Sequence, residues 1–458
     1  MRRLWLLILL FPLWSCSGPS SSSSPPPPPP GGSPLLLKAS SNHRYLVDQK
    51  NNAPVLLVGD SPHSMFVNLN STDLATYLAN RQGHGFNILW VEGLCTDYIS
   101  NCRSDLSTFD GIKPFTSGTD ETSFDVSTPN AAYWSRVDSY VNTAASYGII
   151  ILFDTWETGA LMPLARANGN TKMHDYGAFL GNRYKNVPNI IWITGNDFQT
   201  WTDPTDNALM QNLMAGIASA DPNHLQTTEL NFTVSGSLDD PLLVPYTTLA
   251  GAYDYYCAYA ESLDQYNYPS PVPVFFEEGF YEYGGTVHNL RTQAWWVALA
   301  GATAGQMYGS LNIYPFASGW KSYLDTTGVT EFGYLRSLLT SIKWYNLIPD
   351  QSHTIVTSGY GTLDSGQDGN CINTNDYVTT SYLADGTGSV SYIPQGATVV
   401  VDLSKFSGSV TAKWYDPTSG SSNTISGSPF ANTGTQSFST PGTNSSGDPD
   451  WVLLLTTN

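Results

Sequence analysis

Charged side chains are scarce in this chain of 458 residues: they make up 12% of it, whereas hydrophobic residues make up 41%. Lys and Arg number only 19 against 38 Asp and Glu, which gives a net charge of −19. Binding to nucleic acid or to an anionic membrane surface requires clustered cations, so we expect neither as a partner. The same charge balance does not oppose uncharged ligands such as sugars.

Histidine is also rare, and its spacing matches no metal site. The seven histidines are His43, His63, His84, His174, His224, His288 and His353. No glycine-rich phosphate loop follows a predicted strand either, so we expect no metal and no cofactor. His63 and His174 are the two that could line a pocket, although a surface or core position is more common for such residues.

The apolar run at the N-terminus, Leu4 to Leu13, is too short to span a bilayer as a helix. It ends in Leu13-Trp14-Ser15-Cys16, which resembles a bacterial lipobox. We therefore expect residues 1–16 to be a lipoprotein signal peptide with Cys16 as the lipidated N-terminus; an ordinary secretory leader is the alternative. Residues 17–34 are rich in Ser and Pro and should form an extended linker. The protein would then be lipid-anchored in the bacterial cell envelope, outside the cytoplasm.

Four cysteines remain beyond Cys16. Cys95 and Cys102 are close together in a polar loop, and export permits disulfides, so we expect this pair to form a bridge. Cys257 lies in an apolar segment, and Cys371 lies far downstream. These two either pair across a domain junction or are both free, and the sequence does not decide between the two possibilities.

Short apolar runs alternate with helical periodicity from residue 35 to about residue 349, which predicts a (β/α)8 barrel; an open doubly wound sheet is the alternative. The predicted strands are 54–60, 86–92, 149–153, 189–197, 225–230, 250–256, 273–278 and 305–313. The predicted helices are 71–83, 130–147, 174–184, 206–219, 288–304 and 331–345, with Ser71 as the cap of the first.

Helical periodicity disappears in residues 350–458, where short β-rich runs are separated by turn signals such as Asp385-Gly386. The predicted strands are 377–383, 389–393, 398–403, 410–415 and 451–456. This spacing indicates a small all-β sandwich that follows the barrel.

Acidic residues stand at the predicted strand ends, which share one face of a barrel. They are Asp60, Glu92, Asp154, Glu157, Asp197, Glu229, Asp254 and Glu278. Aromatic residues accompany them, namely Trp90, Trp156, Trp192, Tyr281, Tyr308 and Tyr314. This combination suits glycoside hydrolysis, which needs two carboxyl groups on opposite sides of the scissile bond. Asp197 after the fourth strand and Glu278 in the seventh would face each other across the barrel.

At these residues the chain resembles the apiosidase-like glycoside hydrolases, whose barrel precedes a small domain named after collagen binding. Its landmarks are Leu57-Val58-Gly59-Asp60, Gly85-Phe86-Asn87, Asn189-Ile190-Ile191-Trp192, Gly195-Asn196-Asp197, Pro273 to Glu278, Tyr281-Glu282, Gln293-Ala294-Trp295-Trp296 and Tyr308-Gly309, with Tyr392 to Gly396, Trp414 to Pro417 and Asp450 to Leu453 in the tail. The resemblance implies a carbohydrate substrate and no cofactor, with Asp197 as acid/base and Glu278 as nucleophile.

The same resemblance implies that Asp60, Trp156 and Glu282 shape the sugar subsite. Asn196 and Tyr308 are further substrate-binding candidates. Two positions depart from the family pattern: Asn196 stands where glycine is usual, and Glu277 replaces the glycine before the catalytic glutamate. Glu277 could raise the pKa of Glu278 or point into the barrel wall. The domain name is no ground for expecting collagen as a ligand.

Two other functions fit parts of the sequence. Gly59-Asp60-Ser61 and the distant His353 mimic the ends of a GDS-type serine esterase, with Ser61 as nucleophile. The barrel could also bind polysaccharide without cutting it. We expect a glycoside hydrolase that acts as a monomer on plant-type polysaccharide, with a retaining mechanism and with apiose-containing pectic side chains as a possible substrate.

Overall fold

The structure is a computed structural model, and it describes residues 36–99, 101–364 and 369–457. The predicted signal peptide, the lipidation site Cys16 and the whole predicted linker, residues 17–34, therefore lie outside the described residues. In the part that is described, no helix is both long enough and apolar enough to cross a membrane.

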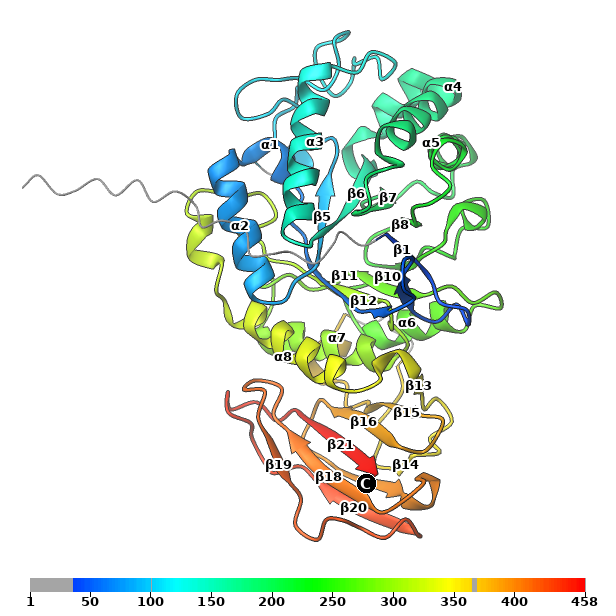
Figure 1. The fold of residues 1–458 in the computed structure, drawn as a ribbon, viewed down its shortest axis with the longest axis vertical. Helices are drawn as coiled ribbons and strands as arrows, with labels where there is room; N and C mark the ends of the chain where they lie inside the picture. Colours follow the sequence, from blue (N-terminus) through cyan, green and yellow to red (C-terminus); the bar gives the residue numbers. More distant parts are fainter. Residues whose placement is uncertain (1–35, 100, 365–368, 458) are drawn as a thin grey trace, which may run out of the picture.

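A curled nine-stranded sheet forms the centre of the larger part of the molecule (Figure 1). Its order is β8-β7-β6-β5-β4-β12-β11-β10-β9. All neighbours are parallel except β9, which pairs antiparallel with β10. The backbone N–H groups of Thr248 and Leu249, just before β10, donate to the carbonyl of Gln226 in β8 and so bring the two ends of the parallel sheet together. The predicted barrel is confirmed.

All eight predicted barrel strands are present. They are β4 (Leu57–Asp60), β5 (Ile88–Glu92), β6 (Ile150–Glu157), β7 (Ile190–Gly195), β8 (Gln226–Thr228), β10 (Ala250–Asp254), β11 (Val274–Glu278) and β12 (Gly305–Tyr308), with β9 at Val234–Gly236. Their side chains are buried on both faces because helices cover the outside and residues such as Leu57, Trp90 and Ile191 fill the inside. This double burial is why the strands are continuous apolar runs in the sequence.

The helices of the described residues mostly follow the predicted periodicity. They are α1 (Met65–Asn68), α2 (Ser71–Gly83), α3 (Ala131–Ser146), α4 (Thr158–Tyr184), α5 (Pro204–Ala220), α6 (Ala258–Tyr266), α7 (Val287–Leu299), α8 (Thr327–Ser341) and α9 (Cys371–Thr374). The predicted cap of α2 is wrong by one residue, since the side chain of Asn70 accepts the N–H groups of Thr72 and Asp73. α4 begins earlier than predicted, and Gly169 interrupts it with a φ of 74°.

The C-terminal part consists of two antiparallel sheets, which supports the predicted sandwich (Figure 1). The larger sheet contains β13 (Leu347–Pro349), β15 (Thr379–Leu383), β16 (Gly388–Ile393), β21 (Trp451–Thr457), β18 (Val410–Tyr415) and β19 (Ser422–Thr424). The smaller contains β14 (Val356–Ser358), β17 (Thr398–Asp402) and β20 (Thr435–Ser439). The sequence missed β14, β19 and β20, which are short and largely exposed, so they lack the apolar alternation that marks a strand.

Helices α7 and α8 lie between the barrel and the sandwich (Figure 1). Buried Arg291 of α7 donates to Asp450 and Asp448, which precede β21, and to Glu331 of α8. The sandwich is thus attached to the barrel through its outer helices.

A small antiparallel sheet of β1 (Leu37–Ala39), β2 (Leu46–Asp48) and β3 (Pro54–Val55) precedes the first barrel strand.

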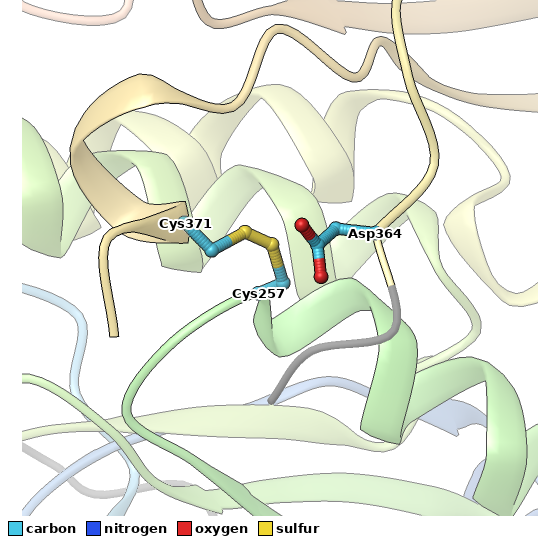
Figure 2. Close-up of side chains that lie close together, drawn as sticks. All are labelled: Cys257, Asp364 and Cys371. Carbon is cyan, nitrogen blue, oxygen red and sulfur yellow. A yellow bond between two sulfur atoms is a disulfide. The ribbon is translucent and has the colours of Figure 1, made fainter. Parts of the chain in front are cut away.

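A disulfide adds a covalent connection between the two parts. Cys257, which caps α6, is bonded to Cys371 at the start of α9, and their Cα atoms are 5.5 Å apart (Figure 2). This settles the alternative that the sequence left open in favour of pairing. The carboxyl group of Asp364 lies beside the bridge, but the two sulfurs are used by the disulfide, so this trio does not offer thiolate ligands to a metal.

Candidate active site

Asp197 follows the end of β7 in a backbone turn that few residues adopt. Gly195, Asn196 and Asp197 have φ angles of 136°, 75° and 57°, all in the region that favours glycine. A side chain at Gly195 would place its Cβ 2.2 Å from the carbonyl oxygen of Glu229, so only glycine fits there. The backbone N–H of Asp197 donates to Glu229 Oε2 at 2.9 Å. This turn fixes the direction in which the Asp197 carboxylate points.

Tyrosine hydroxyls hold both predicted catalytic carboxylates. Asp197 accepts from Tyr253 at 2.8 Å and from Tyr98 at 2.5 Å. Glu278, the last residue of β11, accepts from Tyr255 at 2.7 Å and from Tyr281 at 3.0 Å. Tyr253 lies in β10, the neighbour of β11 in the sheet, and Tyr255 directly follows β10. The rings of these two tyrosines are 5.6 Å apart. The two acids are therefore positioned by one connected set of phenols.

The two carboxylates open into the same pocket, which has a volume of about 350 Å³. The described residues that line it are His63, Tyr98, Ile99, Asn196, Asp197, Tyr255, Glu278, Tyr281, Leu311 and Tyr314. None of these is Lys or Arg. The lining is thus aromatic and acidic, as expected for a site that binds an uncharged, hydroxyl-rich ligand.

Burial and mutual repulsion leave these acids without their ordinary acidity. Burial raises the pKa of Glu278 to about 8, and the nearby charge of Asp197 adds to the effect. Burial also raises the pKa of Asp197, against the hydrogen bonds from Tyr98 and Tyr253, which lower it. Because the charge of Asp197 opposes ionisation of Glu278, the two carboxyls titrate as a coupled pair. Glycoside hydrolysis requires one acid and one base, and a coupled pair of carboxyls can supply both.

Three further predicted acids lie behind the pair. Glu229 receives the N–H of Asp197, and burial followed by the charges of Glu278 and Asp197 raises its pKa. Glu92 accepts from the side chain of Asn196 at 3.2 Å. Glu157 accepts from Thr96 at 3.0 Å and caps α4, and burial raises its pKa to about 8. These carboxyls shape the turn and the pocket floor.

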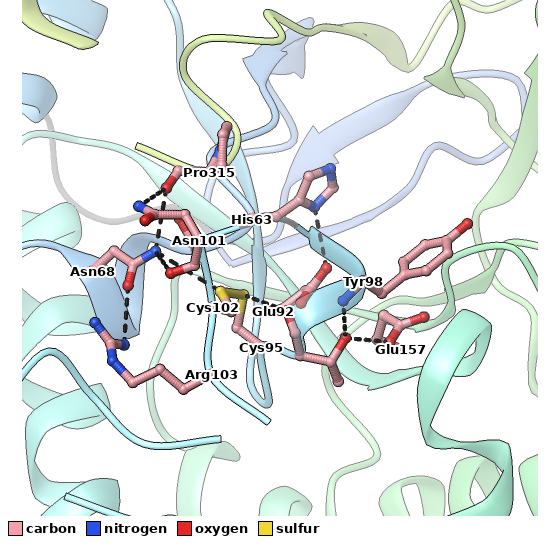
Figure 3. Close-up of a disulfide and its surroundings, with 12 residues drawn as sticks. His63, Asn68, Glu92, Cys95, Tyr98, Asn101, Cys102, Arg103, Glu157 and Pro315 are labelled. Carbon is pink, nitrogen blue, oxygen red and sulfur yellow. Dashed lines mark hydrogen bonds and ion pairs between the residues drawn. A yellow bond between two sulfur atoms is a disulfide. The ribbon is translucent and has the colours of Figure 1, made fainter. Parts of the chain in front are cut away.

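His63 connects this inner layer to the pocket (Figure 3). Its Nε2 is 3.0 Å from the hydroxyl of Tyr281, and its Nδ1 is 3.8 Å from Glu92. Burial lowers the pKa of His63 to about 3, so the imidazole is neutral and adds no positive charge. His63 is thus one of the two histidines that the sequence offered as pocket residues, whereas His174 lies on α4, beside Asp175 and outside the lining.

The predicted disulfide between Cys95 and Cys102 is confirmed, with Cα atoms 5.9 Å apart. The loop that it closes carries Tyr98, and Figure 3 shows the ring beside Glu157. Asn68 anchors the far side of the loop, since its Nδ2 donates to the carbonyls of Asn101 and Pro315, both at 3.2 Å. The bridge therefore holds the loop that brings the Tyr98 hydroxyl to Asp197.

Two predicted substrate ligands are placed elsewhere. Asp60 is fully buried, and it accepts from Arg81 and Tyr77 at 2.6 Å each and from the N–H of Ser61. Trp156 is also fully buried and packs on Tyr176 in the core outside the barrel strands. Because their side chains are occupied by protein contacts and do not line the pocket, we correct both assignments to structural roles.

The same correction applies to Glu282 and Tyr308. The hydroxyl of Tyr308 donates to Glu282, which also accepts from Thr326 at 2.6 Å and from the N–H of Gly328 at 3.1 Å. Both side chains are buried behind the pocket wall. Asn196 alone of the five predicted substrate ligands lines the pocket.

Glu277 points into the barrel rather than into the pocket. It is fully buried, and a Cβ on Gly251 of the next strand would lie 2.0 Å from its Oε2. Burial raises its pKa, against a 3.4 Å hydrogen bond from Thr227. Of the two possibilities that the sequence left open, the position in the barrel wall is the one observed.

The geometry of a serine esterase is missing. Ser61 donates to the carbonyl of Tyr308 at 3.3 Å, and His353 stacks on Tyr360 with ring centroids 3.7 Å apart, beyond the last barrel helix. Sequence reasoning did not find Tyr98, Tyr253 and Tyr255 as site residues. The run Tyr253-Asp254-Tyr255 at a strand end was a usable signal, whereas nothing in the loop sequence distinguishes Tyr98.

Comparison with known family models identifies both parts of the chain. Residues 40–346 match the family model described as "Apiosidase-like, catalytic domain", and residues 368–456 match one described as "Putative collagen-binding domain of a collagenase". No curated protein matches the chain by sequence.

Solved structures agree with the fold. The chain is similar to a family 5 glycoside hydrolase from Bacteroides vulgatus, with a TM-score of 0.76 and 22% identity over 92% of this chain and 93% of the other. A second structure, described as a glycoside hydrolase, has a TM-score of 0.75 and 22% identity over 93% of this chain and 97% of the other. By the family match over most of its length, this chain belongs to the apiosidase-like family of glycoside hydrolases.

Proposed function

We propose that the protein hydrolyses a glycosidic bond in a plant-type polysaccharide or oligosaccharide, with Asp197 as the acid/base and Glu278 as the nucleophile. The observation that carries the proposal is the pair itself: two half-buried carboxyls, one just after β7 and one at the end of β11, are held by tyrosines and face one pocket. Because the pKa values of both carboxyls are raised, one of the pair can hold a proton while the other is ionised, and the reaction needs one group in each state.

The mechanism that we propose is retaining and proceeds in two steps. Glu278 attacks the anomeric carbon while Asp197 gives its proton to the glycosidic oxygen, so the C–O bond to the leaving group breaks and a glycosyl ester forms. Asp197 then takes a proton from water, and the resulting hydroxide displaces Glu278 from the sugar. The phenols of Tyr255 and Tyr281 stabilise the glutamate as it leaves.

The substrate that we propose is a neutral sugar, and apiose-containing side chains of pectin are the first to test. The pocket volume of about 350 Å³ suits one sugar residue. A uronic acid would bring a carboxylate to a lining that has two carboxyl groups and no Lys or Arg among the described residues, so repulsion would oppose its binding. The family match supports apiose, and the pocket chemistry supports the absence of charge.

The test is a screen of the purified protein on pectic and hemicellulosic oligosaccharides, with Glu278→Gln as the inactive control. Azide rescue then separates the two roles. With Glu278→Ala, azide should give a glycosyl azide of inverted configuration, and with Asp197→Ala one of retained configuration. Unchanged turnover by Asp197→Asn on a glycan that the wild type cuts would remove Asp197 from the mechanism.

The second candidate is a surface protein that binds polysaccharide without cutting it, which the aromatic lining of the pocket favours. In that case the wild type and Glu278→Gln would bind an oligosaccharide with the same affinity, and neither would release product.

We further propose that the protein is a monomer held at the cell envelope by a lipid on Cys16. Radiolabelled palmitate should be incorporated by cells that express the wild type and not by cells that express Cys16→Ala.

A further inference from the structure

Large apolar side chains are exposed around the mouth of the pocket. In the described part of the chain, Phe232 is 50% exposed, Tyr98 is 48% exposed and Leu311 is 41% exposed. Tyr98 and Leu311 line the pocket, and the ring of Phe232 contacts Tyr255, which lines it as well. A gathering of exposed rings at the entrance to a site marks a surface that is covered when ligand binds.

Phe232 is exposed although its backbone is well fixed. The carbonyl of Leu230 accepts the N–H of Phe198 at 2.9 Å, and the carbonyl of Thr233 accepts the N–H of Tyr255 at 3.1 Å. Between them, the side chain of Asn231 accepts from Trp201 at 2.7 Å. These bonds fix the chain on both sides of Phe232, and its ring rests against Tyr253 and Tyr255.

The exposed rings border Asp197 in particular. Phe232 lies against Tyr253 and Tyr255, with ring centroids 6.3 and 5.3 Å apart. Tyr253 and Tyr98 are the two tyrosines that donate to the Asp197 carboxylate. Gly159 leaves space for the second ring, since a Cβ there would lie 2.9 Å from Tyr98. Phe232 and Tyr98 are thus the exposed aromatic groups next to the acid.

We propose that Phe232 and Tyr98 form an aromatic subsite that binds the sugar residue on the leaving side of the scissile bond. This inference rests on the proposed function, in which Asp197 protonates the glycosidic oxygen and therefore faces the leaving group. A sugar ring presents an apolar C–H face, and an exposed aromatic ring gains by covering it, without any charge on either partner. The enzyme then prefers substrates whose leaving group is itself a sugar.

The test compares Phe232→Ala with wild type on two substrates: an apiose-containing pectic oligosaccharide and apiosyl fluoride, whose leaving group has no ring. For the oligosaccharide, kcat/KM should fall roughly tenfold. For the fluoride it should stay unchanged, and Phe232→Trp should restore the oligosaccharide rate. Phe109→Ala is the matched control, because Phe109 is 46% exposed beside Arg136 and does not line the pocket.

The outcomes separate this inference from the proposed function. Equal losses on both substrates, or no loss on either, would overturn the aromatic subsite and leave the proposed hydrolysis standing. Failure of the wild type to cut the oligosaccharide would overturn the proposed hydrolysis of pectic glycans. In that case calorimetric binding of the same oligosaccharide decides: weaker binding by Phe232→Ala than by Phe109→Ala supports the stacking surface, and equal or absent binding overturns it.

Discussion

The molecule contains a buried group of carboxylates at the domain junction and a half-buried group in the pocket, and the two groups differ in whether a cation accompanies them. At the junction with the sandwich, Asp450 and Glu331 surround Arg291, whose side chain is 2% exposed. Burial lowers the pKa of Arg291, but Asp450 and its neighbours more than offset this and raise it, so the arginine stays charged. In the pocket, Asp197 and Glu278 have tyrosines and other acids as neighbours, and none of the described lining residues is Lys or Arg.

The difference teaches what a buried carboxylate is for. With a cation at hydrogen-bond distance, the acid forms an ion pair that attaches one part of the fold to another, although burial still raises the pKa of Glu331 to about 7. Without one, burial raises its pKa, and the group can hold or release a proton near neutral pH. Asp60 belongs to the first class because of Arg81, which is why its position at a strand end did not make it a substrate ligand.

The largest effect is expected from removing either member of the pocket pair. Glu278→Gln or Asp197→Asn should lower kcat/KM by about 10³-fold or more, since each deletes the nucleophile or the proton donor. The amide is isosteric, and the thermal midpoint of unfolding should change little. Turnover measured beside a calorimetric scan checks both, and an inactive variant that also unfolds early would not count as support.

At the junction, the loss should fall on stability instead. Arg291→Ala leaves Asp450 and Glu331 buried without a cation, and should lower the free energy of unfolding by about 3–5 kcal/mol. Denaturant titration measures the loss in the free energy of unfolding. At low temperature, where the variant is still folded, its kcat should equal that of the wild type. Arg183→Ala is the control, because its pair with Asp138 is 27% and 35% exposed and should cost only about 0.2–1 kcal/mol. Equal losses in the two variants would contradict the comparison.

A smaller change is expected from Tyr98→Phe, which keeps the ring and removes one donor from Asp197. That hydrogen bond lowers the pKa of Asp197, so its loss should raise it further. Asp197 would then keep its proton to higher pH, and the alkaline limb of the kcat/KM profile should move upward. A profile that shifts downward, or a loss of rate equal at every pH, would show that the phenol does not act through the acid.

The smallest effect should come from Glu277→Gln, one residue before the nucleophile. Burial raises the pKa of Glu277 well above its usual value, which favours the neutral carboxyl in the barrel wall, and the amide resembles that form. We expect kcat/KM within a factor of about three of wild type and an unmoved pH profile. A shift in the part of the kcat/KM profile near pH 8 would show instead that Glu277 helps to set the pKa of Glu278.

Much of the fold could be read from local pattern. The eight barrel strands are apolar because both faces of the sheet are covered, and the helices between them keep one apolar stripe. α6 was missed because it has nine residues and its buried face includes the polar Ser262 and Gln265. β13 was missed because it has three residues, and β14, β19 and β20 because they are short and exposed. Such elements are held by pairing with distant residues, which no local window contains.

The chain sequence placed Asp197 and Glu278 at strand ends and named them as the catalytic pair, because strand order in a barrel puts those ends on one face. The tertiary structure decided which other residues reach them. Tyr98 arrives from a disulfide-closed loop 99 residues before Asp197, while Asp60, Trp156, Glu282 and Tyr308 turn to partners elsewhere. A side chain's partner depends on the fold of distant segments, so strand position alone could place an acid at the barrel mouth but could not supply its neighbours.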